Sequence, residues 1–281
     1  MNKLLIVCGP TATGKTSLAI ELAKKFRGEL VSADSRQVYK GLDGLTGKGR
    51  SQDIPIWLYD VVAPGDEFSV AHFVRLARAR IGYIEKQGRL PIVVGGTGFY
   101  LRALTETIDT IFIPPDWELR TMLATLSLEE LQKRLNKKRF EKMNESDQKN
   151  PRRLIRAIEI EEKGIFAPPP SQTFDALWIG LIAAPSALKR RIQMRIRARF
   201  ALAVHEARDN LPPILGAKQV LAFKRGKLTR EDAIARWQTE EYQYAKRQLT
   251  WFRKEKDIHW FDVTEPDFRR RIIDTVRSWY T

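Results

Sequence analysis

Residues 9–16 read Gly9-Pro10-Thr11-Ala12-Thr13-Gly14-Lys15-Thr16 and match the phosphate-loop pattern G-x-x-x-x-G-K-S/T at every fixed position. An apolar run before the loop, Lys3–Cys8, predicts a buried parallel strand, and the periodicity of Ser17–Phe26 predicts a helix after it. Glycines let the loop amides converge on phosphate oxygens, and the helix N-terminus adds partial positive charge. We expect Lys15 to supply a mobile cation and the Thr16 hydroxyl to ligate Mg²⁺. The loop therefore predicts a phosphate compound as ligand without specifying which one.

The same alternation continues beyond the loop and sets the fold class. Strands are predicted over Glu29–Ala33, around Ile56–Val62 and over Leu90–Val94, with a helix near Val70–Gln87 between the last two. Strand–helix alternation of this kind predicts an α/β fold. We expect a doubly wound parallel sheet like that of the P-loop NTPases, with ligands at the carboxyl ends of the strands.

The sequence pattern changes after residue 113. From Asp116 to Gly164 the chain is helical in pattern and heavily charged, and Pro168–Pro170 follows as a linker. Strand patterns return at Ala176–Ala184 and at Ile258–Val263. We therefore predict a core formed by residues 1–113 and 174–281, interrupted by a helical insertion over residues 114–173.

The composition is that of a globular protein with an unusual charge. Of 281 residues, 49 are Lys or Arg and 34 are Asp or Glu, which gives a formal net charge of +15. Such an excess predicts a polyanionic partner, either a nucleic acid or an anionic membrane surface. A membrane-spanning helix is not expected, because the chain has no run of about 18 apolar residues. The single cysteine, Cys8, excludes an internal disulfide framework and a multi-thiolate zinc site, and we expect a cytoplasmic protein.

The strand ends argue against nucleotide hydrolysis. A standard NTP-hydrolysing protein places an Asp after a second buried strand, where it helps to hold the metal. Here Ile92–Val94 runs into Gly95-Gly96-Thr97 instead, and Asp60 follows only a short strand. The sequence thus disfavours an NTPase and an NTP-gated RNA-binding protein, while a P-loop kinase acting on a small metabolite remains open.

Five more blocks follow the phosphate loop. They are Ser32-Ala33-Asp34-Ser35-Arg36-Gln37-Val38-Tyr39-Lys40-Gly41, Phe68–Phe73, Val94–Tyr100, Asn150–Glu159 and Gln243–Arg253. With these blocks in this order, over nearly its whole length, the chain resembles the tRNA dimethylallyltransferase family, also called tRNA isopentenyltransferases. The resemblance implies transfer of the dimethylallyl group from dimethylallyl diphosphate to N6 of the adenosine immediately 3′ of the anticodon in tRNA. It also implies N6-isopentenyladenosine as product, Mg²⁺ as cofactor, and a phosphate loop that holds the diphosphate.

The resemblance assigns Asp34 as the general base. An adenine amino group is a poor nucleophile because its lone pair is delocalised, and a carboxylate that accepts its proton accelerates the step by about 10²–10⁴-fold. The alternative is that Asp34 caps the next helix or holds Mg²⁺ through water. Lys15, Thr16, the loop amides and Mg²⁺ would stabilise the departing diphosphate. Thr97 matches the family's threonine beside the reacting groups, and its alternative is a hydroxyl bonded within a Gly-Gly-Thr-Gly turn.

Two segments match the family's contacts to tRNA, the expected macromolecular partner. The contacts to the acceptor adenosine and its neighbours would come from Asp34, Ser35, Arg36, Gln37 and Thr97. That adenosine has to leave the base stack before it can react. Within the insertion the matching residues are Arg120, Arg152, Arg153, Leu154, Ile155 and Arg156, and the alternative for each arginine is a solvated helix surface. We expect a monomer that acts on the anticodon stem-loop, away from membranes.

Two stretches depart from the family pattern. Asp43–Gly49 replaces the usual Asp-Ile-Gly-Thr-Ala-Lys-Pro, and Gly216-Ala217-Lys218-Gln219 replaces the usual Gly-Tyr-Lys/Arg-Glu/Gln. Some family members carry an arginine upstream of the second stretch that contacts the diphosphate, and the sequence does not place it. The basic segment Lys189–Arg199 matches no family motif, and we expect it to contact the tRNA backbone. Prenylation of free adenine nucleotides remains an alternative reaction, disfavoured by the insertion and the C-terminal block.

Overall fold

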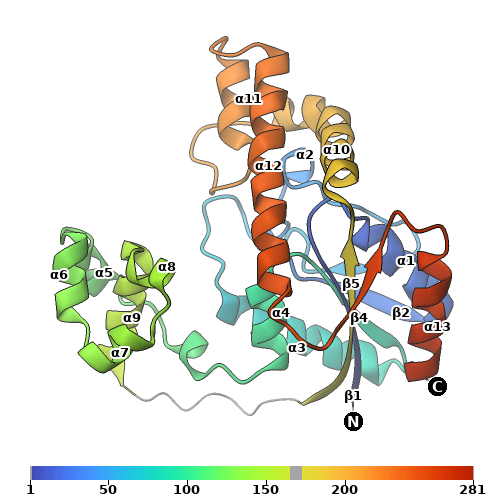
Figure 1. Cartoon of the computed structure of the whole chain (residues 1–281), viewed down its shortest axis with the longest axis horizontal. Coiled ribbons are helices and arrows are strands. Elements are labelled where there is room, and N and C mark those ends of the chain that lie inside the picture. Colours follow the sequence, from blue (N-terminus) through green and yellow to red (C-terminus); the bar gives the residue numbers. More distant parts are fainter. Residues whose placement is uncertain (1, 165–172, 281) are drawn as a thin grey trace. The chain divides into compact units, whose positions relative to one another are not determined.

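The computed structural model describes residues 2–164 and 173–280, and its sheet has six strands, all parallel, in the order β3-β2-β4-β1-β5-β6 (Figure 1). The strands are β1 (Asn2–Cys8), β2 (Gly28–Ser32), β3 (Ile56–Trp57), β4 (Leu90–Val94), β5 (Phe174–Ile182) and β6 (Ile258–Asp262). This confirms the predicted α/β fold class. It also brings the carboxyl ends of β2, β4 and β1 together at one edge, because β4 pairs with both of the other strands.

Helices cover both faces of the sheet. They are α1 (Lys15–Phe26), α3 (Val70–Lys86), α4 (Gly98–Thr105) and α13 (Phe268–Tyr280), with a short α2 (Asp43–Thr46) in the connection after β2. Side chains of α1 and α13, among them Leu22 and Ile272, are fully buried against the strands. In Figure 1, α1 and α13 lie on one side of the sheet and α3 and α4 on the other. Strands covered on both faces consist mostly of apolar residues, which is why the sequence pattern located most of them.

A helical lobe continues the core after β5. It consists of α10 (Pro185–Glu206), α11 (Ala217–Lys224) and α12 (Arg230–Phe252), which share one apolar cluster that includes Phe200 and Trp237. Gly216 has φ of 81°, and a Cβ there would lie 2.2 Å from the Trp237 ring, so only glycine fits before α11. The far end of α12 reaches the sheet, where Gln248 Nε2 donates to Gly96 O at 2.8 Å. Helix α12 therefore links the lobe to the end of β4.

The strand predicted over Ile56–Val62 is much shorter than expected. Leu58 and Asp60 have φ of 67° and 56°, which ends strand pairing after Trp57. Asp60 then pairs with Lys48, 2.6 Å away, and with Arg50, so its carboxylate belongs to a local ion-pair network. It is not among the residues that line the cavity described below. The remaining predicted strands lie within two residues of the observed ones.

The second compact unit spans Glu106–Ser171 and is described here by itself. Its helices are η1 (Asp109–Phe112), α5 (Trp117–Leu123), α6 (Leu128–Arg134), α7 (Lys137–Lys142), α8 (Glu145–Gln148) and α9 (Pro151–Lys163). They enclose a small apolar cluster centred on Leu123 and Leu154. The unit begins before the expected Pro114, because Arg156 of α9 donates to Thr110 O and Ile113 O and ties η1 to it. The linker predicted at Pro168–Pro170 lies outside the described residues.

Candidate active site

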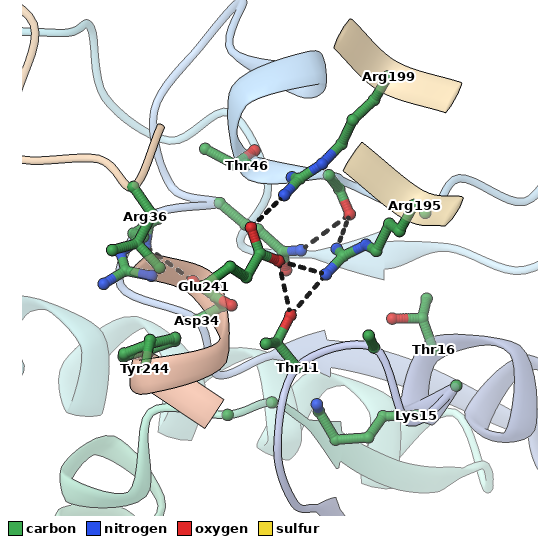
Figure 2. A pocket seen from close by; sticks show the side chains of 18 of the residues that line it. Thr11, Lys15, Thr16, Asp34, Arg36, Thr46, Arg195, Arg199, Glu241 and Tyr244 are labelled. Atoms are coloured by element: carbon green, nitrogen blue, oxygen red, sulfur yellow. Dashed lines mark hydrogen bonds and ion pairs between the residues drawn. The ribbon is translucent and has the colours of Figure 1, made fainter. Parts of the chain in front are cut away.

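A cavity of about 520 Å³ opens at the carboxyl ends of β1, β2 and β4 (Figure 2). The phosphate loop follows β1, Asp34 follows β2, and Gly95–Gly96 follow β4, and each of these segments lines the cavity. The opposite wall comes from two helices of the lobe. It includes Arg191, Met194, Arg195 and Arg199 of α10, and Glu241, Tyr244 and Gln248 of α12. The cavity thus lies where a parallel sheet places its ligand, as the sequence predicted.

The phosphate loop is held in shape by its own polar groups. Lys15 Nζ donates to Pro10 O at 2.7 Å, and Thr13 Oγ1 donates to the same carbonyl oxygen at 2.9 Å. Gly9 has φ of 126°, and a Cβ there would lie 2.3 Å from Leu181 O, so β5 leaves room for glycine alone. The loop residues Thr11, Ala12, Gly14, Lys15 and Thr16 line the cavity.

Lys15 and Thr16 are the two loop residues whose side chains have predicted chemical roles. Burial, followed by the nearby Arg195, lowers the pKa of Lys15 to about 8. The side chain is therefore mostly protonated at neutral pH but titrates within reach of physiological conditions. The Thr16 hydroxyl is hydrogen-bonded to Tyr59, and burial raises the pKa of that phenol, so Tyr59 stays a neutral partner.

Asp34 lines the cavity directly after β2. Its Oδ1 accepts a hydrogen bond from Arg36 N at 2.9 Å, which fixes a local turn rather than the start of a helix. Asp34 therefore does not cap a helix, and one of its carboxylate oxygens stabilises a turn instead. The guanidinium of Arg36 lies 4.0 Å from the centre of the Tyr244 ring, a cation–π contact that holds both side chains beside Asp34.

Thr97 joins the ends of β2 and β4. Its Oγ1 accepts from Ser35 N at 3.0 Å, while its own N–H donates to Ala33 O at 3.2 Å. Its side chain also hydrogen-bonds with Tyr244, whose pKa is raised by burial. Thr97 is not among the residues that line the cavity, so in this structure it supports the segment that carries Asp34.

Gln37 is buried and bonded within the protein. Its Oε1 accepts from Ser32 Oγ at 3.1 Å, and its Nε2 lies 3.5 Å from Gly47 O. The amide therefore connects the end of β2 with the Gly47 turn while still lining the cavity.

Helix α10 contributes three cations that the sequence had suggested for the tRNA backbone. Arg191 Nε donates to Ala12 O at 2.9 Å, and Arg195 donates to Thr11 Oγ1 at 2.6 Å and to Gly47 O at 2.8 Å. Arg199 lies one turn further along the helix and donates to Leu45 O at 3.1 Å. The four-residue spacing places all three on one helix face, and that spacing was the available signal. Helical spacing does not reveal whether such a face meets a ligand pocket or solvent.

The predicted insertion residues divide into buried and exposed sets. Arg120 and Arg156 both pair with Glu159, whose carboxylate is fully buried, and Arg153 pairs with Asp147. Leu154 is fully buried in the unit's core, so its side chain contacts protein. The remaining two are Ile155, which is half-buried, and Arg152, which is exposed.

Comparison with known proteins identifies related sequences over the whole chain. The family described as IPP transferase matches residues 37–255, and the family described as isopentenyl transferase matches residues 2–56. A tRNA dimethylallyltransferase of Thermomicrobium roseum is 38% identical over 306 residues, covering 98% of this chain and 92% of that protein. The corresponding protein of Pediococcus pentosaceus is 36% identical over 301 residues, covering 99% and 97%.

Solved structures give the same result. The tRNA isopentenylpyrophosphate transferase of Bacillus halodurans superposes with a TM-score of 0.73 at 31% identity, covering 99% of this chain and 97% of that one. A eukaryotic dimethylallyltransferase, studied while acting on tRNA, superposes with a TM-score of 0.80 at 26% identity. That superposition covers 100% of this chain and 80% of the eukaryotic one.

Proposed function

The chain belongs to the tRNA dimethylallyltransferase family, and we propose that it transfers the dimethylallyl group of dimethylallyl diphosphate to N6 of the adenosine immediately 3′ of the anticodon. One observation carries the proposal beyond the family name. A phosphate loop and a carboxylate, Asp34, line the same cavity from two strand ends separated by a single strand. A diphosphate donor and a proton-losing acceptor therefore have room to meet there.

The donor's diphosphate would lie over the phosphate loop. Loop amides and the N-terminus of α1 attract its oxygens, and Lys15 adds a full charge. Arg195 of α10 donates to Thr11 Oγ1 and lines the same cavity, so it would take the role of the family's diphosphate-contacting arginine, which the sequence had left open. These groups stabilise the charge that develops on the diphosphate as it departs.

Thr16 is the residue that would hold Mg²⁺, and its position in the cavity wall beside Lys15 fits that role. Residues 2–164 and 173–280 contain no group of three or more His, Cys, Asp or Glu side chains able to hold a metal. The other ligands would therefore be donor oxygens and water, an arrangement that Mg²⁺ commonly adopts. When bound, Mg²⁺ would withdraw charge from the leaving diphosphate.

Asp34 would act on the acceptor. As the bond from N6 to the dimethylallyl carbon forms, the bond from that carbon to the diphosphate oxygen breaks. N6 becomes positively charged unless it loses a proton, and the Asp34 carboxylate is the group placed to accept it. Thr97 and the Arg36–Tyr244 contact would keep the Asp34 segment in place during this step.

The tRNA would be attracted mainly by the core. The unit spanning residues 106–171 contains twelve basic and twelve acidic residues, so the net charge of +15 resides in the rest of the chain. Arg152, exposed on α9, would add a phosphate contact from the insertion. No helix within residues 2–164 and 173–280 is long and apolar enough to cross a membrane. We expect the enzyme to act as a monomer in the cytoplasm.

The coupling of transfer to diphosphate release tests this function. The protein is incubated with Mg²⁺, dimethylallyl diphosphate and an unmodified anticodon stem-loop, and prenylated RNA and released diphosphate are both counted. We expect one diphosphate for each prenylated RNA, with no consumption of ATP when it is added. Release of ADP in proportion to product would instead support a kinase, and a failure to transfer the dimethylallyl group would contradict the proposed function.

A further inference from the structure

Glu241 is a buried carboxylate on the wall of the diphosphate cavity. It lies on α12 and is 4% exposed. Its Oε1 accepts from Thr11 Oγ1 at 3.1 Å and lies 3.4 Å from an Nη1 of Arg195, while its Oε2 accepts from Arg199 Nη2 (Figure 2). Helix α12 thereby contacts both the phosphate loop and the arginines of α10 through one side chain.

An anionic side chain at this position needs a physical reason. The cavity has to attract a diphosphate, yet two of its lining residues, Asp34 and Glu241, are acids. Asp34 has a role at the acceptor. Glu241 would repel the donor unless its charge were compensated, because Coulomb interactions between partly buried groups are weakly screened.

Arg199 provides that compensation. Its side chain is 10% exposed, ion-paired to Glu241 and 4.6 Å from the centre of the Trp237 ring. Burial lowers the pKa of Arg199 only to about 10, so the guanidinium is charged at neutral pH. The Glu241–Arg199 pair is therefore neutral as a unit. The other cations that line the cavity are Lys15, Arg191 and Arg195, together with Arg36, which stacks on Tyr244.

Glu241 also restricts the groups that would bind the donor. The guanidinium of Arg195 is held by Thr11, Gly47 and Glu241 on three sides, and Thr11 N donates to Gln248 Oε1 at 2.8 Å. Because the Arg195 side chain is already fixed, it loses less conformational entropy when a ligand binds. A Gln at position 241 would have one acceptor oxygen, which is too few for Thr11, Arg195 and Arg199 together.

We propose that Glu241 is a positioning residue of the donor site, which holds Thr11 and Arg195 toward the diphosphate while Arg199 neutralises its charge. The proposal rests on the proposed function, because it assigns the cavity to a diphosphate donor. It predicts that, once Arg199 is removed, Arg195 pairs with the Glu241 carboxylate at the expense of the donor. It also predicts that removing both charges together is less harmful than removing Arg199 alone.

The test compares Arg199→Met, Glu241→Gln and the double variant with the wild type. Calorimetry with Mg²⁺ and inorganic diphosphate measures binding in the absence of tRNA. Arg199→Met is expected to weaken binding by about tenfold or more, and adding Glu241→Gln to restore it to within about threefold of the wild type. If Glu241 had a purely structural role, adding Glu241→Gln to Arg199→Met would weaken diphosphate binding further. A double variant that binds as weakly as Arg199→Met would overturn the proposal.

A second readout is independent of Arg199→Met and decides the question even if that variant folds poorly. In single-turnover transfer at saturating donor, Glu241→Gln is expected to be slower by about tenfold, because Arg195 and Thr11 are less well fixed. A wild-type rate for Glu241→Gln would overturn the proposal. Melting curves establish that each variant is folded.

Glu231→Gln is the matched control, since it removes the same charge from α12 at a site 72% exposed, about 15 Å along the helix from Glu241. Unchanged binding and rate in this variant are expected, and a defect equal to that of Glu241→Gln would contradict a local role.

The proposed function and the positioning role of Glu241 can fail independently of each other. If the wild type binds diphosphate but prenylates no tRNA, the proposed function is wrong. The binding comparison among the variants then still shows whether Arg199 neutralises the charge of Glu241.

Discussion

The pKa of Lys15 predicts that the proposed donor site depends on pH, which its sequence motif does not reveal. Its pKa of about 8 means that the ammonium, present at pH 7, is mostly lost by pH 9. Donor affinity should fall over that interval by up to about tenfold per pH unit once the pH exceeds the pKa, because the charged form binds the anion. Calorimetric titration with dimethylallyl diphosphate across pH 7–9 measures the effect.

Lys15→Arg is the control, because a guanidinium does not titrate in this range. Lys15→Arg should bind the donor more weakly than the wild type at pH 7, because a guanidinium differs in geometry from an ammonium. Its donor affinity should then change little between pH 7 and pH 9. The ionisation of the ligand is common to both proteins. The same pH profile in Lys15→Arg would show that another group titrates.

Asp34 carries the proton transfer in this account. Asp34→Asn keeps the side chain's size and the hydrogen bond from Arg36 N but cannot accept a proton. The single-turnover rate should drop by roughly 10²-fold or more, with binding of tRNA and donor little changed. Rapid-quench transfer to an anticodon stem-loop gives the rate, and binding is measured separately.

A Mg²⁺ series separates the two roles considered for Asp34. If the carboxylate mainly orients a metal-bound water, raising Mg²⁺ should rescue much of the lost rate. A near-wild-type rate at saturating Mg²⁺ would remove Asp34 from the base role.

Among the elements, α9 shows that a matched motif can hold arginines in different environments. Arg152 is exposed, whereas Arg156 bonds Glu159, Thr110 O and Ile113 O. Arg152→Ala should therefore lower the slope of log K against log salt for tRNA binding by about 1, with unchanged stability. Arg156→Ala should instead lower the melting temperature, because it leaves part of the buried Glu159 charge unpaired.

Fluorescence titrations from low to moderate salt, paired with melting curves, distinguish these outcomes. An unchanged slope for Arg152→Ala would identify Arg152 as a solvated surface residue. Unchanged stability of Arg156→Ala would contradict the structural role assigned to that arginine.

Helix α10 marks where prediction from the sequence ended. The sequence located the helix and its charge, but it could not show that Arg191 and Arg195 contact the phosphate loop, about 180 residues earlier in the chain, or that Arg199 lines the same cavity. Glu241 had no signal of its own, because one acid on a helix of mixed charge resembles any solvated charge. Such pairings depend on tertiary packing, which periodicity does not encode.

At the scale of the whole molecule, prediction succeeded where local rules are strong. The phosphate loop, the apolar strands and the Gly95–Gly96 turn have patterns that determine fold class and the edge of the sheet that binds ligands. The strand order could not be predicted, because the crossover connections between strands produce no periodic pattern in the sequence. The net charge of +15 was evident from the sequence, but its location outside residues 106–171 became clear only from the structure.

The central claim is that one cavity joins a prenyl diphosphate to a tRNA adenosine. Nucleoside mass spectrometry, after incubation of unmodified tRNA with the protein, Mg²⁺ and dimethylallyl diphosphate, tests it most directly, with adenosine monophosphate present as a competing acceptor. The account predicts a mass gain of one dimethylallyl group on N6 of the adenosine immediately 3′ of the anticodon and none on the mononucleotide. Prenylation of the mononucleotide in preference to tRNA, or no modified nucleoside at all, would contradict it.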